Sequence, residues 1–149
     1  MLYCGRVVSG YQLGRKLGYP TANLKIDPAI FPKDGVYAGK VDGSKLGVRL
    51  AAVSVGTRPT VDGKRRVFEI YIPGFKGNLY GTKLKVSLLK KIRGQKKFSS
   101  LQGLKRQIAQ DVRNVLEFKI KGLAKDRQTP DRKKTSRLLG SRKVQSKKA

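Results

Sequence analysis

The fold is decided by residues 35–55, GVYAGKVDGSKLGVRLAAVSV, where two runs rich in β-forming residues flank an Asp-Gly pair. Asp42-Gly43 tolerates the positive φ angles that tight hairpin turns require. The runs Gly35 to Val41 and Gly47 to Val55 are therefore predicted to pair as antiparallel strands.

Three further runs have the same character, and Asp62-Gly63 marks a second hairpin turn. They are Tyr3 to Val8, Arg66 to Ile72 and Lys83 to Ile92. The connection from Gly18 to Lys33 is interrupted by three prolines, which leaves room for one short strand near Ala22 to Ile26. We expect a structured, ligand-binding loop there.

After the last strand the apolar residues recur every three or four positions, which predicts an amphipathic helix. They are Leu101, Leu104, Ile108, Val112 and Val115. Ser99 with Gln102 fits a capping box and Gly122 is a plausible end signal, so the helix is predicted to span Ser100 to Lys121.

Five or six short strands with one helix exclude a doubly wound sheet, which needs helices between its strands. We predict a mainly β fold, a small closed antiparallel barrel with one C-terminal amphipathic helix, over residues 1–122. Residues 123–149 are basic and poor in large apolar side chains, so they are predicted to form a disordered tail.

The composition limits the classes of function that the chain can have. The 149 residues suit one domain, and a formal net charge of +26 attracts nucleotides, nucleic acids and other anions. Histidine is absent and Cys4 is the one cysteine, which excludes histidine-based triads and an intramolecular disulfide. With no signal peptide and no apolar run of membrane length, we expect a soluble, cytoplasmic protein.

A loop near the N-terminus carries glycines at positions 10, 14 and 18 around Arg15 and Lys16. Its backbone can approach an anion closely while two cations stand near it. The loop alone fits an ordinary barrel turn equally well, because it matches neither the Walker nor the dinucleotide pattern.

Two oxygen-bearing side chains follow this loop in Pro20-Thr21-Ala22-Asn23. Magnesium prefers oxygen ligands and often takes only one or two from protein, so Thr21 and Asn23 are candidate metal ligands. The alternative is that both residues serve the turn after Pro20 by hydrogen bonding.

Glu69 lies in the middle of a strand-like run, Val67 to Ile72, and is one of only two glutamates. It is either the partner of a cation in a structural salt bridge or a general base that faces a cavity. Periodicity alone favours the salt bridge.

In this order, the segments resemble the riboflavin kinase family, the flavokinase module of bacterial FAD-synthesis enzymes. The resemblance runs from about Gly5 to Asp111 and rests on motifs that include Gly14 to Leu24, Gly35 to Ala38, Gly56 to Thr60, Phe68 to Ile70, Leu79 to Gly81, Ile92-Arg93 and Phe98 to Leu101. It implies a six-stranded Greek-key barrel in which Mg²⁺, ATP and riboflavin meet at one rim.

The resemblance also implies roles for individual residues. Thr21 and Asn23 would bind Mg²⁺, and Glu69 would act as base on the 5′-hydroxyl of riboflavin. The nucleotide would be bound by Gly10, Gly14, Arg15, Lys16, Gly18 and Pro20. The flavin would be bordered by Arg93, Phe98 and Leu104, although from its own sequence context Phe98 is expected in the core.

The chain departs from the family pattern at two site positions and at its start. Tyr71 stands where a histidine is usual, and Gln95 stands where a glutamate is frequent. The chain opens in its first strand and has no counterpart of the adenylyltransferase half, so we do not expect FAD synthesis from it.

The main prediction is therefore a monomeric riboflavin kinase that makes FMN from riboflavin and ATP. One rival is a non-catalytic, basic barrel that binds nucleic acid, a partner that the tail could also contact through Arg132-Lys133-Lys134 and Arg142-Lys143. Against this rival, no predicted strand presents paired aromatics for base stacking. A non-catalytic flavin or nucleotide binder is a third reading, which the intact Thr21, Asn23 and Glu69 disfavour.

Overall fold

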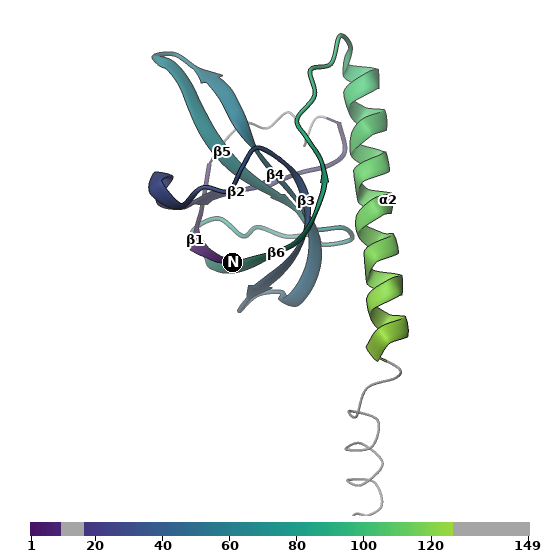
Figure 1. The fold of residues 1–149 in the computed structure, drawn as a ribbon. Helices are drawn as coiled ribbons and strands as arrows, with labels where there is room; N and C mark the ends of the chain where they lie inside the picture. Colours follow the sequence, from purple (N-terminus) through teal and green to yellow (C-terminus); the bar gives the residue numbers. More distant parts are fainter. Residues whose placement is uncertain (10–16, 127–149) are drawn as a thin grey trace, which may run out of the picture. The chain divides into compact units, whose positions relative to one another are not determined.

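The computed structural model describes residues 1–9 and 17–126, with side chains up to residue 118 (Figure 1). The chain forms two compact units, residues 1–116 and 117–149. The first unit holds all the strands and carries the candidate site. The loop glycines and cations at positions 10, 14, 15 and 16 lie outside the described residues, as does the tail from residue 127 onward.

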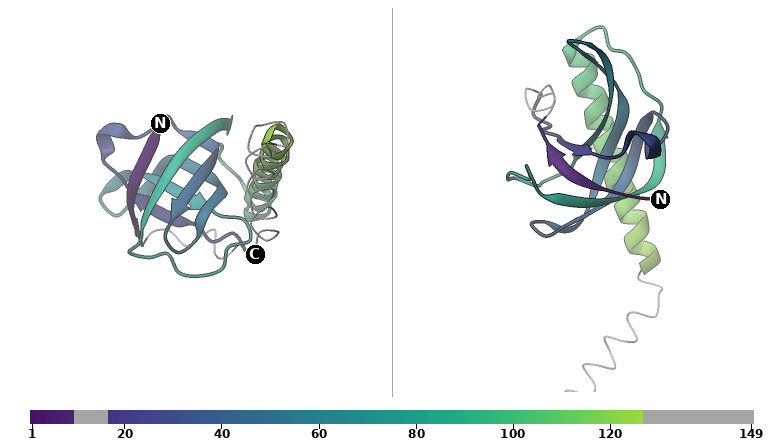
Figure 2. Two further views of the ribbon diagram at one scale, coloured as in Figure 1. Left: turned by 90° about the horizontal axis from the view of Figure 1, so that it is seen from below. Right: turned by 90° about the vertical axis from the view of Figure 1, so that its left-hand side faces the viewer.

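Six antiparallel strands close into a barrel, and the views in Figure 2 show the strands curving round to meet. Around the barrel the order is β1-β2-β5-β4-β3-β6. The elements in chain order are β1 (Leu2–Val8), β2 (Ala22–Lys25), the 3-10 turn η1 (Pro28–Ile30), β3 (Gly35–Gly43), β4 (Gly47–Thr60), β5 (Gly63–Tyr71), β6 (Lys83–Arg93) and α2 (Leu101–Asp126).

The predicted fold class is confirmed: the protein is mainly β, with a closed six-stranded antiparallel barrel and one helix that follows it. The Greek-key description stays a prediction. The sequence underestimated β4, which continues through Pro59 to Thr60, where Thr60 faces Gly63 across a tight turn. Gly63 has a φ of +144°, a conformation that glycine adopts without strain.

The barrel interior is filled by the inward side of each strand, because strand side chains alternate between the two faces. Its largest fully buried members include Phe68, Ile70 and Leu84. The Phe68 ring contacts Tyr3 and Phe31, with ring centroids 5.5 and 6.5 Å away. This packing on β5 fixes which residues of the strand face outward.

The helix begins one residue later than predicted and ends beyond the predicted stop. The Ser100 hydroxyl accepts a hydrogen bond from the Gly103 backbone N–H at 3.1 Å, so Ser100 is the N-cap in place of Ser99. The end signal at Gly122 is wrong, because α2 runs on to Asp126. A glycine stops a helix only where the backbone turns to positive φ. Val115 is fully buried, whereas Leu101 is 60% exposed and not part of the apolar stripe.

Within the described residues, no helix is both long enough and apolar enough to cross a membrane. The monomeric state and the cytoplasmic location stay predictions.

Candidate active site

A row of polar residues crosses the outer surface of three adjacent strands. Asn23 of β2 pairs with Glu69 of β5, and Glu69 pairs with Ser54 of β4. Their chain neighbours, such as Phe68 and Ile70, are buried in the core, so the row itself faces out of the barrel. Paired residues of an antiparallel sheet have Cβ atoms about 5 Å apart on one face. The fold therefore brings the predicted base beside one of the two predicted metal ligands.

Glu69 is largely enclosed although it faces outward. Its side chain is 12% exposed, and its Oε1 lies 3.6 Å from Nε of Arg58. The carboxylate makes no hydrogen bond to any residue that the structure describes. Burial raises the pKa of Glu69 above its ordinary value, and the Arg58 guanidinium offsets part of that shift. The salt bridge that periodicity favoured for Glu69 is thus present. Neither carboxylate oxygen accepts a hydrogen bond from a described residue, so either oxygen can still accept a proton.

Asn23 is the enclosed polar side chain of β2, with 8% of its surface exposed. Its side-chain amide has no hydrogen-bond partner in the described part of the chain. Asn23 lines a pocket, so its amide can be reached by a molecule bound there. The arrangement is therefore suited to a ligand that contacts this amide.

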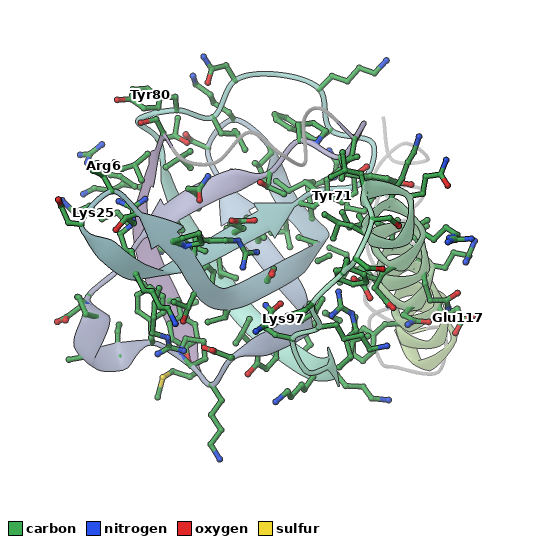
Figure 3. The ribbon with its side chains drawn as sticks, turned by 90° about the horizontal axis from the view of Figure 1, so that it is seen from above. Arg6, Lys25, Tyr71, Tyr80, Lys97 and Glu117 are labelled. Carbon is green, nitrogen blue, oxygen red and sulfur yellow. The ribbon has the colours of Figure 1, made fainter. Side chains whose placement is uncertain are left out.

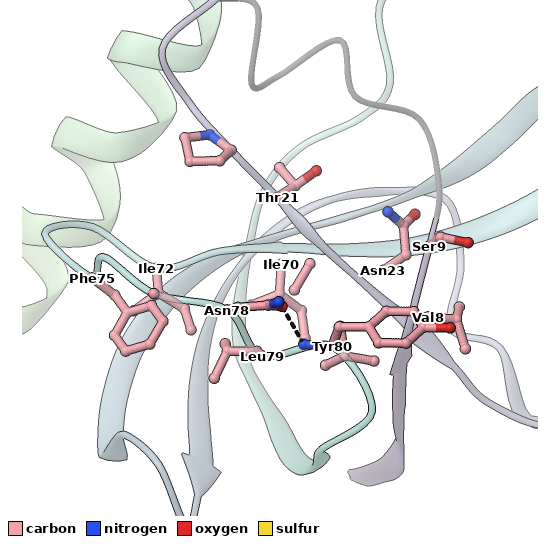
Figure 4. Close-up of a pocket in the computed structure, with 14 residues that line it drawn as sticks. Val8, Ser9, Thr21, Asn23, Ile70, Ile72, Phe75, Asn78, Leu79 and Tyr80 are labelled. Atoms are coloured by element: carbon pink, nitrogen blue, oxygen red, sulfur yellow. Dashed lines mark hydrogen bonds between the residues drawn. The ribbon is translucent and has the colours of Figure 1, made fainter.

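A pocket of about 620 Å³ opens beside Asn23 at one end of the barrel (Figure 4). Its walls come from the end of β1, the segment Pro20 to Asn23, the end of β5 and the loop around Asn78 to Tyr80. Asn78 Oδ1 accepts a hydrogen bond from the Tyr80 backbone N–H at 2.9 Å, which orders that loop. Glu69 does not line the pocket, so Asn23, its partner in the sheet, joins the candidate base to this cavity.

The loop that follows β6 is fixed to α2 by an ion pair. Arg93 donates from Nε and Nη2 to the two carboxylate oxygens of Asp111, both at 2.8 Å, and from Nη1 to the Gly94 carbonyl at 2.9 Å. Gln107 Nε2 also donates to Asp111 Oδ1 at 3.0 Å. Arg93 and Asp111 side chains are only 14% and 5% exposed. The ion pair of Arg93 with Asp111 therefore holds the loop in place.

The family model for riboflavin kinase, named Flavokinase, matches residues 1–119. The chain belongs to the riboflavin kinase family.

Curated relatives agree with this family membership. The bifunctional riboflavin kinase/FMN adenylyltransferase of Escherichia coli K12 is 43% identical over 114 residues, which cover 76% of this chain and 36% of that protein. The RNA-binding riboflavin kinase RibR of Bacillus subtilis is 38% identical over 125 residues, covering 82% of this chain and 53% of RibR. The chain thus spans about a third to a half of the length of these relatives.

A solved structure gives the same result. The crystal structure of riboflavin kinase from Trypanosoma brucei superposes with a TM-score of 0.56 at 28% identity, and the match covers 78% of each chain. The closed barrel is thus the fold of a riboflavin kinase.

Tyr71 lies two residues after Glu69 on β5 (Figure 3). Its ring meets Tyr19 edge-on, with centroids 5.4 Å apart. Burial and the neighbouring Tyr19 raise the pKa of Tyr71, so it stays neutral at physiological pH. The contact between the two tyrosine rings attaches the segment before Thr21 to β5, the strand that carries Glu69.

The remaining predicted site residues lie near the pocket or on the loop and helix that follow β6. Gly18 has a φ of +87°, and Pro20 lines the pocket. Phe98 and Leu104 are half-buried on the loop and helix after β6. The expectation of a core position for Phe98 is wrong, because its ring is not part of the barrel's hydrophobic cluster.

Sequence reasoning missed two neighbours of the base and one wall of the pocket. Arg58 lies in a motif that supports the family resemblance, but its contact with Glu69 depends on strand register. The position of Ser54 beside Glu69 likewise follows only from the register between β4 and β5. The loop from Asn78 to Tyr80 reads as a flexible hairpin, and only the adjacent motif Leu79-Tyr80-Gly81 could have drawn attention to it.

Proposed function

We propose that the chain is a riboflavin kinase that transfers the γ-phosphoryl group of ATP to the 5′-hydroxyl of riboflavin and gives FMN and ADP. The observation that carries this proposal is the pairing of Glu69 with Asn23. It brings an enclosed carboxylate with no hydrogen-bond partner among the described residues next to an amide that lines the pocket. The family membership supports the same reaction.

Glu69 would serve as the general base. An alcohol is a weak nucleophile at neutral pH, and a carboxylate aligned with it takes the proton as the new oxygen–phosphorus bond forms. The bond between the γ-phosphorus and the bridging oxygen breaks, and ADP leaves. A raised pKa makes Glu69 a stronger base than an ordinary glutamate, and the nearby Arg58 opposes part of that rise in pKa, which favours the ionised form.

The nucleotide would bind on the pocket side of Asn23. The pocket volume of about 620 Å³ falls in the range of ordinary small-molecule sites. Pro20 lines it, and Gly18 precedes it with a backbone conformation that suits a close approach to an anion. We assign Gly10, Gly14, Arg15 and Lys16 to the same nucleotide from the family pattern.

Thr21 and Asn23 would hold a magnesium ion. Asn23 fits this role because its side chain lines the pocket and makes no hydrogen bond to another described residue. Both side chains line the pocket, and two neutral oxygens suffice where phosphates and water complete the shell. When bound, such an ion neutralises the charge that develops on the phosphates.

Riboflavin would bind on the other side of the row, where Phe98 and Leu104 border the loop after β6. Arg93 would act there through its ion pair with Asp111, since the guanidinium already makes three hydrogen bonds. The flavin and the nucleotide would then approach Glu69 and Asn23 from opposite sides.

A direct assay tests this function. The full chain is mixed with riboflavin, ATP and Mg²⁺, and the products are separated by chromatography. We expect FMN and ADP in equal amounts. Absence of FMN with folded protein would refute the proposed function, and ADP without FMN would indicate hydrolysis instead of phosphoryl transfer to the flavin.

A second candidate function is nucleic-acid binding beside the kinase activity. Lys25 of β2, Arg6 of β1 and Lys83 of β6 stand opposite one another in the sheet register, and Lys85 follows on β6. None of the four forms an ion pair within the described residues. Like charges directly opposite destabilise a sheet, so such a row favours a polyanionic partner. Figure 3 shows Arg6 and Lys25 on the same side of the barrel.

The relative named RNA-binding riboflavin kinase RibR makes RNA the first ligand to test. We expect a labelled single-stranded RNA to bind with an affinity that falls steeply between about 50 and 200 mM salt, measured by fluorescence anisotropy. Reversing two charges with Lys83→Glu/Lys85→Glu should weaken binding about tenfold. The matched reversal Lys45→Glu/Lys64→Glu, elsewhere on the barrel, should weaken it less. Equal losses would show that only net charge matters.

A further inference from the structure

Gln95 connects the loop after β6 to the sheet beside the base. Its Nε2 donates to the Val55 carbonyl at 2.8 Å and to the Ser54 hydroxyl at 3.1 Å. Ser54 stands directly opposite Glu69 in the sheet. The side chain of Gln95 is therefore attached one strand away from the base.

The orientation of this amide is fixed by its partner. A backbone carbonyl can only accept hydrogen bonds, so the amide nitrogen of Gln95 must face Val55. A glutamate has no proton to donate at neutral pH and could not make this contact. Glutamine at position 95 thus gives this chain an attachment that a glutamate there would not provide.

The backbone of β4 leaves space for the Gln95 side chain because position 56 is a glycine. A Cβ atom added at Gly56 would lie 2.9 Å from Gln95 Nε2 and 3.1 Å from its Cδ. Those distances are shorter than ordinary van der Waals contacts, so the glutamine side chain occupies the space that a larger residue at position 56 would need.

The same loop has a second attachment at its start. Arg93 is held by Asp111 of α2, and Lys96 Nζ lies 3.4 Å from Gln107 Oε1 on that helix. Residues 94–100 therefore connect to the sheet through Gln95 and to the helix through Arg93. Two attachments on different elements restrict the loop more than either one would alone.

We propose that Gln95 is a positioning residue for the phosphoryl acceptor: it fixes the loop of residues 94–100 against β4 so that loop and sheet hold riboflavin beside Glu69. This inference rests on the proposed function and deepens it. Gln95 acts through the loop, and its hydrogen bonds lie on the side assigned to the flavin, away from the pocket that Asn23 lines. Its loss should therefore affect the two substrates differently.

The test is Gln95→Met, which keeps the length of the side chain and removes both hydrogen bonds. We expect KM for riboflavin to rise about tenfold, the effect of two modest hydrogen bonds, while kcat and KM for ATP stay within about twofold. Riboflavin fluorescence titration should show the same loss of affinity without turnover. The melting temperature should change little, because the contact is partly exposed.

Two further variants separate this role from a general effect. Lys97→Met alters an exposed neighbour in the same loop and should leave both KM values unchanged. Ser54→Ala removes one acceptor and should raise KM for riboflavin about threefold, with little further effect when it is added to Gln95→Met.

The possible outcomes are distinguishable. Unchanged riboflavin KM and affinity in Gln95→Met, with FMN still formed by the unaltered chain, would overturn this inference and leave the proposed function standing. Equal increases in both KM values would also overturn it, because they would indicate a general loosening. If the unaltered chain makes no FMN, the proposed function fails, and undiminished riboflavin binding by the variant would then overturn the inference as well.

Discussion

Replacing Glu69 with glutamine is expected to lower kcat for FMN formation by about 10²-fold or more. Glutamine has nearly the same shape as glutamate and cannot take a proton from the riboflavin hydroxyl. The measurement is the initial rate of FMN formation at saturating ATP and riboflavin. Near-normal FMN production by this variant would remove Glu69 from the mechanism.

The same variant has an expected effect on stability that rules out unfolding as the cause. Because burial raises the pKa of Glu69 in the folded state, the folded protein binds a proton at this site more tightly than the unfolded chain does. Stability from this group therefore falls as pH rises from the ordinary glutamate pKa through the raised one. At a pH above both values, Glu69→Gln should melt at an equal or higher temperature. A clear drop in melting temperature would instead make Glu69 the structural partner of Arg58.

Arg58→Met is the matched control for the charge of the base. Arg58 lies 3.6 Å from the carboxylate and lowers its pKa, so its removal should raise the pKa of Glu69 further. The acidic limb of the profile of kcat/KM against pH should then move to higher pH, while activity at alkaline pH is kept. A limb that does not move would indicate that a group other than Glu69 controls it.

The sequence predicted the fold well because its local patterns agree with one another. The alternating runs are local signals, and they located all five main strands to within a few residues. The turn predicted at Asp42-Gly43 was placed too early, because both residues pair with β4 as the end of β3 and the chain turns at residues 44–46. The errors arose where local signals compete. Ser99 and Ser100 are both suitable caps, and the hydroxyl of Ser100 is the one that accepts the hydrogen bond from Gly103.

The sequence was enough to select the residue types of the candidate site, but it did not show which of these residues lie next to one another. Thr21, Asn23 and Glu69 were recognisable because oxygen ligands near a glycine loop and a carboxylate within a strand are unusual. That Asn23 and Glu69 face each other follows from the β2–β5 register, which joins segments more than 40 positions apart in the chain and has no local signal. The contact between Gln95 and Ser54 joins residues 41 positions apart and likewise has no local signal.

The attachment of the loop to α2 leads to the largest expected effect on stability, in Asp111→Ala. Removing one partner of a buried ion pair leaves the other charge without compensation, which typically costs about 3–5 kcal/mol. Arg93 is 14% exposed and would keep its charge, with only the Gly94 carbonyl as a remaining partner among the described residues. We expect the melting temperature of the full chain to fall by about 10 °C.

Two comparisons identify the cause of that loss. Arg106→Ala, an exposed position on the same helix, should leave the melting temperature nearly unchanged. The double variant Arg93→Met/Asp111→Leu should recover most of the stability, because two apolar side chains replace the pair without leaving a buried charge. It should still bind riboflavin more weakly than the unaltered chain, since the bidentate geometry that fixes Gly94 is gone. A double variant as unstable as Asp111→Ala would show that packing around Asp111, and not its charge, stabilises this part of the fold.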